Sequence, residues 1–348
     1  MADIEQVDRN FVVETSLNIE NYKFYDVRQE PFTIYGVFYE NERFRRIPEE
    51  VAKTVNDSVY NLHDRTAGGR VKFITNSSYV AIKAVLPKAV KLPHFTNTGS
   101  AGFDMYVGRN EEYFAAFTPP FNVTGGYESV MPFDNHQEKE ITINFPLYSS
   151  VSELYIGLEA NATLKKAPEY KHKKPIVFYG SSITQGGCAS RPGTAYTSMV
   201  SRNLQSDHIN LGFAGGAKGE NEIAEYIKGL DMSVFVYDYD YNAPTIQHLQ
   251  ETHPRMYRQI RESHPDLPIV MLSRPKYKLN QDHQARRDLI QKTYDDAVAA
   301  GDKNVYFIDG PTLMKYVKNE GTVDRGHPND MGFYSMAKVL TKLLKKLI

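Results

Sequence analysis

Apolar or β-branched side chains recur at every second position through much of the first half of the chain. This alternation covers residues 71–75, 141–145 and 154–158, and residues 79–86 form a continuous β-branched and apolar run. A period of two is typical of half-buried antiparallel strands. Gly-Gly, Asn-Ser-Ser and Pro-Pro turns separate the runs. The pattern therefore predicts a β-sandwich of the jelly-roll type, interrupted by a helix around residues 48–59.

The second half of the chain shows a different pattern, which begins after a polar, lysine-rich connector at residues 168–175. Short apolar runs bounded by Gly, Asp, Pro or Ser are too short for core helices. They alternate with amphipathic segments whose apolar residues fall at helical spacing. The apolar runs are residues 176–179, 209–211, 234–237, 269–272 and 305–308, and the amphipathic segments are 246–260, 289–297 and 339–347.

This alternation predicts an α/β fold, a doubly wound parallel sheet with helices on both faces. A chain of 348 residues is longer than one hydrophobic core usually serves. We therefore expect two domains, an all-β sandwich over residues 1–168 and an α/β domain over residues 173–348.

The loops that follow the predicted parallel strands are the candidate sites, because ligands bind beyond the carboxyl ends of such strands. The first of these loops contains Gly180-Ser181-Ser182-Ile183. A serine in the first turn of the next helix would lie where free N–H groups stabilise negative charge. Alternatively, Ser181 and Ser182 are helix caps, and the loop taken alone favours capping.

Three later loops carry further candidates. The glycine-rich turn that contains Gly215 fits neither common phosphate-binding spacing, but its N–H groups could stabilise an oxyanion. Asn242 is either an amide donor to an oxyanion or an ordinary turn residue. Asp324 precedes His327 by three residues and could accept the imidazole Nδ1–H, which would leave Nε2 as a base. Alternatively, His327 is a surface-loop histidine.

Taken together and in this order, the four loops resemble the conserved blocks of the SGNH (GDSL-type) hydrolase family. Gly180-Ser181-Ser182-Ile183 resembles the family's Gly-Asp-Ser-Ile/Leu block, and Gly215, Asn242 and Asp324-x-x-His327 match the other blocks. The resemblance implies a flavodoxin-like sheet with Ser182 as nucleophile, His327 as base and Asp324 as its orienting acid. It also implies an oxyanion hole made by the N–H groups of Ser182 and Gly215 and by the Asn242 amide.

The first half adds a second resemblance. Gly102-Phe103-Asp104-Met105-Tyr106 is similar to the Gly-x-Asp-Leu-Tyr signature of a β-sandwich that precedes one SGNH subgroup. The members of this subgroup are mostly bacterial esterases. The likeness therefore implies a serine esterase that acts on short, acetyl-type esters, with O-acetyl groups on carbohydrate as the usual substrate. Alternatives are a longer-chain esterase or thioesterase, of lysophospholipase type, and a non-catalytic carbohydrate-binding protein.

The sequence departs from the family pattern at three places. Ser181 replaces an Asp, so an accessory hydrogen bond is in question. Ala214 and Gly216 replace more polar residues around Gly215. Arg325 stands between Asp324 and Gly326, where a cation could compete with His327 for the carboxylate. None of these departures removes a proposed catalytic group.

Composition and charge exclude several other classes. A net charge of −1 provides no field for nucleic acid, and no run of 18 apolar residues predicts a membrane span. Cys188 is the only cysteine and is interpreted as a packed loop residue. We expect no metal and no cofactor, with a small-molecule or oligosaccharide ester as the substrate. Residues 1–19 do not resemble a signal peptide, so the chain reads as cytoplasmic, or as periplasmic or secreted if a signal has been removed.

Overall fold

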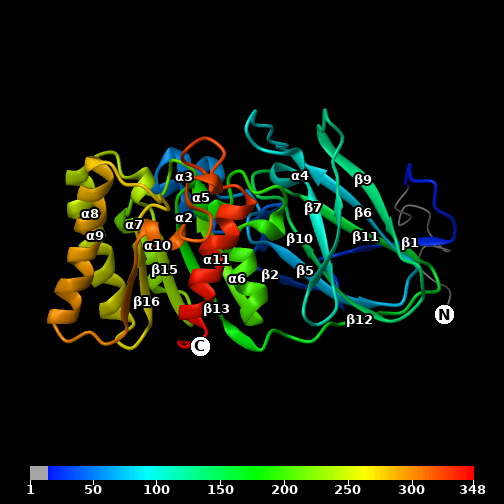
Figure 1. The fold of residues 1–348 in the computed structure, drawn as a ribbon. Helices are drawn as coiled ribbons and strands as arrows, with labels where there is room; N and C mark the ends of the chain where they lie inside the picture. The colour runs from blue at the N-terminus through cyan, green and yellow to red at the C-terminus, as the bar shows by residue number, and fades with distance from the viewer. Residues whose placement is uncertain (1–14) are drawn as a thin grey trace.

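The computed structural model describes residues 15–348, so most of the segment used above to judge a signal peptide lies outside the described residues. An antiparallel β region and a helix-covered parallel sheet lie side by side (Figure 1). The described N-terminal end lies at the far side of the β region, while α8 (Ile246–Ser263) and α9 (Gln281–Ala299) lie at the opposite end. The predicted order of an all-β region followed by an α/β region is confirmed.

The β region consists of two antiparallel sheets and one small hairpin. The first sheet has the order β1-β11-β6-β9 and the second the order β12-β5-β10-β7-β8, with β2 also paired to β5. Their bounds are β1 Tyr22–Asp26, β2 Thr33–Tyr35, β5 Arg70–Thr75, β6 Tyr79–Leu86, β7 Phe103–Val107, β8 Glu112–Phe117, β9 Gly125–Pro132, β10 Lys139–Asn144, β11 Glu153–Glu159 and β12 Leu164–Lys165; the hairpin is β3 Phe38–Glu40 with β4 Arg43–Arg45.

The two sheets share one hydrophobic core, as a sandwich requires. Val71 and Phe73 from β5 and Ile141 from β10 are fully buried against Ile82 and Ile156 from the other sheet. These residues occupy the alternate positions from which the strands were predicted. From β5 to β11 nearly every connection crosses from one sheet to the other, in keeping with the predicted jelly-roll type.

The parallel sheet has the order β14-β13-β15-β16-β17. Numbered from β13, this is the 2-1-3-4-5 order of flavodoxin-like folds, whose ligand site lies where the strand order reverses. That reversal places the ends of β13, β14 and β15 side by side. The strands are β13 His172–Gly180, β14 Ser206–Gly212, β15 Val234–Asp238, β16 Ile269–Leu272 and β17 Val305–Ile308.

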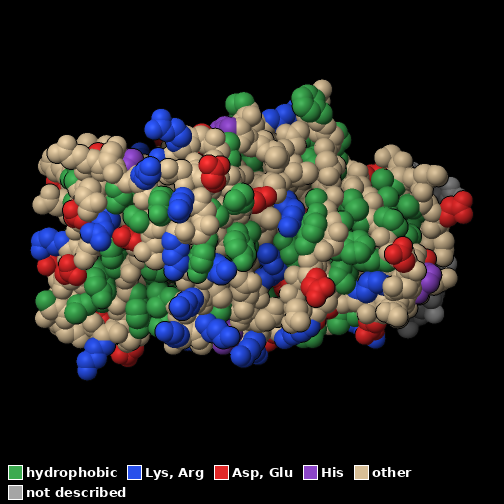
Figure 2. All heavy atoms as spheres, in the orientation of Figure 1, with side chains coloured by type: hydrophobic (Ala, Val, Ile, Leu, Met, Phe, Trp, Pro, Cys, Tyr) green, Lys and Arg blue, Asp and Glu red, His purple; other side chains and the backbone are tan. Residues whose placement is uncertain are grey.

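Helices cover both faces of the parallel sheet because alternate strand residues face opposite sides. Ile176 and Phe178 of β13 pack toward α6 and α11, while Val177 and Tyr179 pack toward α7, α8 and α9. Figure 2 shows Lys and Arg side chains gathered near the C-terminal end of α11. The remaining helices are α5 Ser182–Gln185, α6 Tyr196–Leu204, α7 Asn221–Lys228, α10 Gly310–Leu313 and α11 Asp330–Leu344, with short 3-10 turns η2 Pro192–Thr194, η3 Asp240–Asn242 and η4 Lys318–Gly321.

The helix expected inside the β region is present as two short helices, α2 (Glu49–Val55) and α3 (Asp57–Leu62). Their apolar residues do not join the sandwich core. Ala52 and Val59 are buried in the core of the parallel sheet, beside Ile223 of α7. Residues from the first half therefore complete a face of the second half.

Asp104 of the Gly-Phe-Asp-Met-Tyr motif joins the two halves from inside β7. Its buried carboxylate accepts hydrogen bonds from Arg191 Nη1 at 3.0 Å, the Gly193 N–H at 2.8 Å and Asn144 Nδ2 at 2.8 Å. Arg191 Nη1 also donates to the Tyr106 hydroxyl at 2.5 Å. The motif thus fastens the loop that follows α5 to the sandwich.

The connector between the halves is shorter than the composition suggests. β13 begins at His172, inside the polar stretch expected to be a linker, and its pairing with β14 shifts register between His172 and Ile176. The domain boundary between residues 168 and 173 stays a prediction. None of the helices in residues 15–348 has the length and apolarity needed to cross a lipid bilayer.

Candidate active site

Ser182 lies at the first position of α5, directly after β13. Ser181 is the cap of this helix, because its Oγ accepts the Ile183 N–H at 3.2 Å. The Ser182 side chain is therefore free of the capping role and is half-buried rather than buried. Its Oγ lies 2.9 Å from His327 Nε2. The structure thus distinguishes the serine that caps the helix from the serine that contacts His327.

His327 lies in the loop before α11 and is held from both sides. Its Nδ1 lies 2.7 Å from Asp324 Oδ2, while Asp324 Oδ1 accepts the His327 N–H at 2.7 Å and the Gly326 N–H at 2.9 Å. The Val323 N–H donates to the His327 carbonyl at 2.9 Å and closes the loop. A proton on Nδ1, facing the carboxylate, leaves Nε2 as an acceptor for the Ser182 hydroxyl.

The Asp324 carboxyl is ionised at any ordinary pH. Partial burial alone would raise its pKa, but the hydrogen bonds from the His327 side chain and from the N–H groups of His327 and Gly326 lower that pKa to about 2. A carboxylate opposite Nδ1 stabilises an imidazolium when the ring takes up a proton. The pair can therefore act as a base with a fixed tautomer.

The glycine-rich turn after β14 presents a free N–H group, and β14 is the neighbour of β13, which carries Ser182 at its end. Gly215 has a φ of +68°, in the left-handed region, and an added Cβ there would meet open space. Within residues 15–348, the N–H groups of Ser182 and Gly215 donate to no other protein group. Two unpaired N–H groups after neighbouring strands suit a site for developing negative charge.

Asn242 ends η3, after β15. Its Nδ2 donates to the Phe213 carbonyl at 2.9 Å, the same carbonyl that accepts the Gly216 N–H at 2.9 Å inside the glycine-rich turn. An amide NH₂ has two donors, so one remains after this bond. Asn242 thus holds the glycine-rich turn and keeps a second N–H for another acceptor.

Gln185 is a positioning residue that the sequence analysis did not single out. Its buried side chain accepts the Ala214 N–H at 3.0 Å and donates to the Leu147 carbonyl at 3.1 Å. It therefore ties α5 to the glycine-rich turn and to the sandwich at once. Gln185 belongs to the same loop as Ser182, but the spacing of residues within that loop does not reveal partners that are distant in sequence.

The first half also contributes residues beside Ser182 and His327. The Tyr148 hydroxyl donates to the Ser182 carbonyl at 3.3 Å, and the His94 ring lies 5.6 Å from the His327 ring between centroids. His94 comes from an exposed loop between β6 and β7. Sandwich residues therefore border the site, although periodicity could not place them there.

Arg325 does not compete with His327 for Asp324. Both oxygens of that carboxylate are occupied by the His327 loop, and Arg325 forms no ion pair within the described residues. Arg325 has a φ of +67°, and its carbonyl accepts a hydrogen bond from Lys276. The concern that this cation weakens the acid–base pair is therefore not supported by the geometry.

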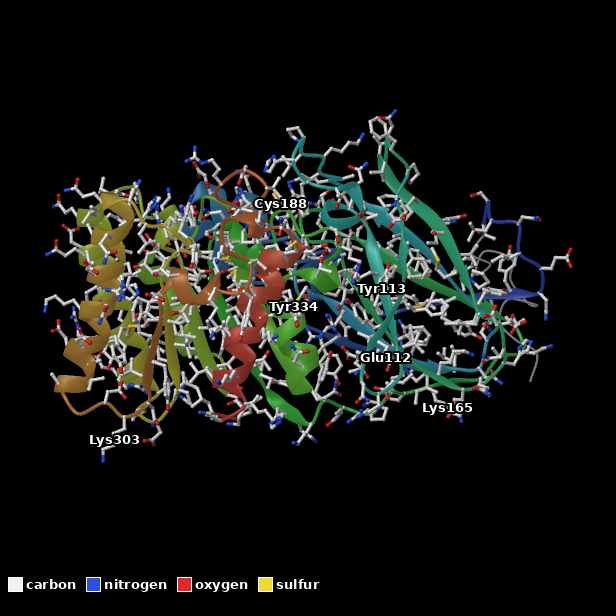
Figure 3. The ribbon with its side chains drawn as sticks, viewed as in Figure 1. Glu112, Tyr113, Lys165, Cys188, Lys303 and Tyr334 are labelled. Atoms are coloured by element: carbon white, nitrogen blue, oxygen red, sulfur yellow. The ribbon has the colours of Figure 1, made fainter. Side chains whose placement is uncertain are left out.

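Cys188 is buried at the junction of the two halves (Figure 3). Burial, with Asp324 nearby, raises the pKa of its thiol to about 12, so it is a poor nucleophile at neutral pH. His94, Cys188 and His327 have donor atoms within 4.8 Å of one another. Because both His327 nitrogens are engaged and the thiol is protonated, this group is poorly suited to a metal. The absence of a metal stays a prediction.

Known proteins resemble both halves of the chain. Residues 173–345 match the GDSL-like lipase/acylhydrolase family, and residues 22–164 match GxDLY, described as the N-terminus of Esterase_SGNH_hydro-type. A protein from Bacteroides ovatus ATCC 8483, described as a GDSL-like lipase, is 31% identical over 94% of this chain and 98% of its own, with a TM-score of 0.83. No curated protein matches the chain.

Two more distant structures share the fold. The salicylyl-acyltransferase SsfX3 from a tetracycline biosynthetic pathway is 21% identical, covering 95% of this chain and 98% of its own, with a TM-score of 0.76. The acetyl xylan esterase Est2A from Butyrivibrio proteoclasticus is 13% identical, covering 93% and 98%, with a TM-score of 0.59. The resemblance inferred from four loops and one β-strand motif is thus confirmed: the chain belongs to the GDSL-like lipase/acylhydrolase (SGNH) family and is a carboxylic ester hydrolase.

Proposed function

We propose that the protein is a serine esterase in which Ser182 is the nucleophile, His327 the base and Asp324 the orienting acid. The observation that carries the proposal is the continuous chain of contacts from Ser182 Oγ to His327 Nε2 at 2.9 Å and from His327 Nδ1 to Asp324 Oδ2 at 2.7 Å. This is the spacing of a nucleophile with its base and the orienting group of that base.

The reaction proceeds through an acyl-enzyme. Ser182 Oγ attacks the ester carbonyl carbon while His327 Nε2 takes the hydroxyl proton, and Asp324 stabilises the imidazolium. Collapse of the tetrahedral intermediate breaks the bond to the alcohol oxygen, which takes the proton from His327. Water then attacks the acyl group by the same route and releases the acid and free Ser182.

The negative charge of the tetrahedral intermediate is held by the Ser182 N–H, the Gly215 N–H and the Asn242 amide. We expect Asn242→Ala to lower kcat about 10²-fold or more, as loss of one oxyanion donor does elsewhere. The assay is the steady-state hydrolysis of 4-nitrophenyl acetate. Asn242→Asp is the matched control, since it keeps the size but cannot donate, and it should be no more active than Ala. An unchanged kcat in both variants would remove Asn242 from the oxyanion hole.

The acyl group is short, acetyl in type, and the alcohol is a carbohydrate. The sequence contains no long apolar segment of the kind that forms a lipase lid. Supporting the carbohydrate assignment, a structure with the same two-part fold is an acetyl xylan esterase. The sandwich serves as a wall of the substrate cleft, since His94 and Tyr148 border Ser182 and His327.

The substrate assignment is tested with 4-nitrophenyl esters of increasing chain length and a panel of acetylated oligosaccharides. We expect kcat/KM to be highest for acetate and acetate to be released from at least one oligosaccharide. A maximum beyond an eight-carbon acyl chain would favour a longer-chain esterase or thioesterase. Binding of oligosaccharides with no turnover of any ester would favour a non-catalytic carbohydrate-binding protein.

A further inference from the structure

A cavity of about 310 Å³ adjoins the loop that carries the acid–base pair. Thr322 and Arg325 of that loop line the cavity, as do residues 275–278, Asn280 and His283. Thr322 pairs with Pro328, immediately after His327, so the lining is continuous with the loop that positions the base.

The cavity is lined by cations without a balancing carboxylate. Lys276, Lys278, Lys318 and Arg325 contribute to its lining, and no Asp or Glu does so among the described residues. Within residues 15–348 none of these four side chains takes part in an ion pair. Lys276 donates only to the neutral carbonyl of Arg325. We call this feature the cationic cavity.

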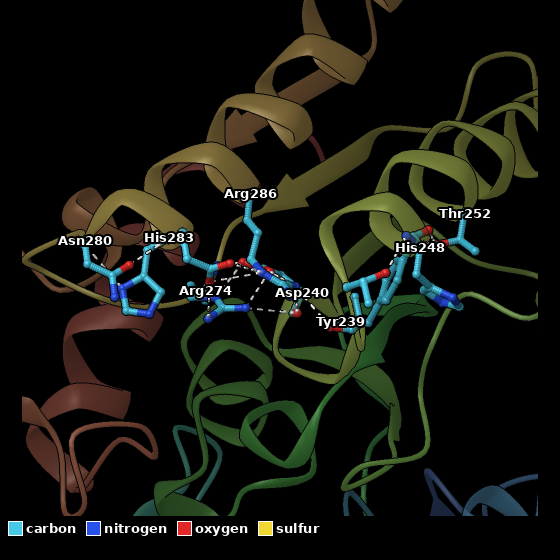
Figure 4. Close-up of polar contacts among 11 residues, drawn as sticks. Tyr239, Asp240, His248, Thr252, Arg274, Asn280, His283 and Arg286 are labelled. Carbon is cyan, nitrogen blue, oxygen red and sulfur yellow. Dashed lines mark hydrogen bonds and ion pairs between the residues drawn. The ribbon is translucent and has the colours of Figure 1, made fainter.

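The acidic groups near the cationic cavity are already neutralised. Buried Asp240 lies 2.9 Å from Arg274 and 3.5 Å from Arg286, and Asp282 lies 3.2 Å from Arg286. Figure 4 shows Arg274, Asp240 and Arg286 clustered next to Asn280 and His283, which begin the helix beside the cavity. Asp324 is engaged by His327. The carboxylates near the cavity therefore already have partners, and none of them belongs to its lining.

Two groups in the lining are perturbed by their surroundings. Burial lowers the pKa of Lys276, and Arg274 and Arg325 lower it further, while Asp324 partly opposes them. Burial likewise lowers the pKa of His283, with contributions from Arg274 and Lys276 that Asp282 and Asp240 partly oppose. The neighbouring cations thus disfavour a further positive charge at both groups, and such surroundings favour a bound anion.

We propose that the cationic cavity binds a carboxylate or sulfate on the alcohol portion of the ester, so that the preferred substrates are acyl esters of acidic alcohols such as acidic sugars. This inference rests on the proposed function, in which His327 gives its proton to the departing alcohol. The alcohol must therefore lie near His327, and the loop that carries His327 also contributes Thr322 and Arg325 to the cavity. Lysine ammonium groups are compact charges that accept either anion, so the shared chemistry is negative charge.

The test compares two anionic esters, 4-acetoxybenzoate and 4-acetoxybenzenesulfonate, with the neutral methyl 4-acetoxybenzoate. Because their intrinsic reactivities differ, the measured quantity is the change between variants in the ratio of kcat/KM, anionic over neutral. We expect Lys278→Glu/Lys318→Glu to lower this ratio about tenfold. This is the size of effect that the loss of two partly exposed ion pairs with the substrate would have. Raising the salt concentration should lower the wild-type ratio as well.

The matched control is Lys303→Glu/Lys345→Glu, which changes the net charge equally at exposed positions outside the lining of the cavity. Figure 3 shows Lys303 at the lower left of the molecule. This control should keep the wild-type ratio. Equal losses in both double variants, or no loss in either, would overturn the proposal. If the neutral ester is not hydrolysed, or is still hydrolysed by Ser182→Ala, the proposed function fails instead, so the two failures are distinguishable.

Discussion

Replacement of Ser182 by Ala should abolish ester hydrolysis in a protein that remains folded. Removal of the nucleophile leaves only oxyanion stabilisation and binding, and such losses lower kcat by on the order of 10⁴–10⁶-fold. Ser182 Oγ contacts His327 but caps no helix, so the free energy of unfolding should change by less than about 0.5 kcal/mol. The measurements are 4-nitrophenyl acetate turnover and urea unfolding.

Ser181→Ala is the matched control, one residue away. It removes the hydrogen bond to the Ile183 N–H and should cost about 1 kcal/mol of stability, yet retain most of the activity. We therefore expect Ser182→Ala to lose activity but not stability, and Ser181→Ala to lose stability but not activity. Substantial turnover by Ser182→Ala, measured as active-site burst as well as steady state, would exclude Ser182 as the nucleophile.

Replacement of Asp104 by Ala should destabilise the whole chain by about 3–5 kcal/mol, the usual cost of removing one member of a buried ion pair. The side chain of Asp104 is fully buried, and that of Arg191 is 20% exposed, so the guanidinium would lose its counterion in a poorly solvated place. Gly193 and Asn144 would each lose an acceptor as well. Guanidinium unfolding measures the effect.

A double-mutant cycle with Arg191→Ala tests whether Asp104 and Arg191, which join the two halves, act as a unit. The double variant should be more stable than the sum of the single changes predicts, because no unpaired charge remains buried. Lys165→Ala is the control, since it removes an exposed ion pair with Glu138 and should cost less than about 1 kcal/mol. If Asp104→Ala lowered the free energy of unfolding no more than this control does, the contact of Asp104 with Arg191 would not be what stabilises the junction of the two halves.

Several features of the structure were predictable because they depend on neighbours in sequence. The strands predicted at residues 79–86, 269–272 and 305–308 have the bounds of β6, β16 and β17. Periodicity of two or of 3.6 reports which face of an element is buried, whatever it packs against. The order of the four loops was also sufficient to identify the family.

Other features depend on contacts between distant segments and could not be read from local patterns. The helix around residues 48–59 was expected to interrupt the sandwich, but its apolar face completes the core beneath the parallel sheet. An amphipathic pattern says that a face will be buried and does not say against what. For the same reason, His94 and Tyr148 were not expected beside Ser182, and the bond of Gln185 to Ala214 was not expected either.

The sequence by itself determined the two kinds of sheet, because these follow from short-range periodicity. The candidate residues Ser182, His327 and Asp324 came from the resemblance of four ordered loops to the blocks of a family. Only the tertiary structure decided which serine caps the helix, which N–H groups stay unpaired and where Arg325 points. The capping bond is local, but its choice of Ser181 over Ser182 required the backbone geometry of the turn. The contact of Ser182 with His327 joins residues 145 positions apart, which no local preference can bring together.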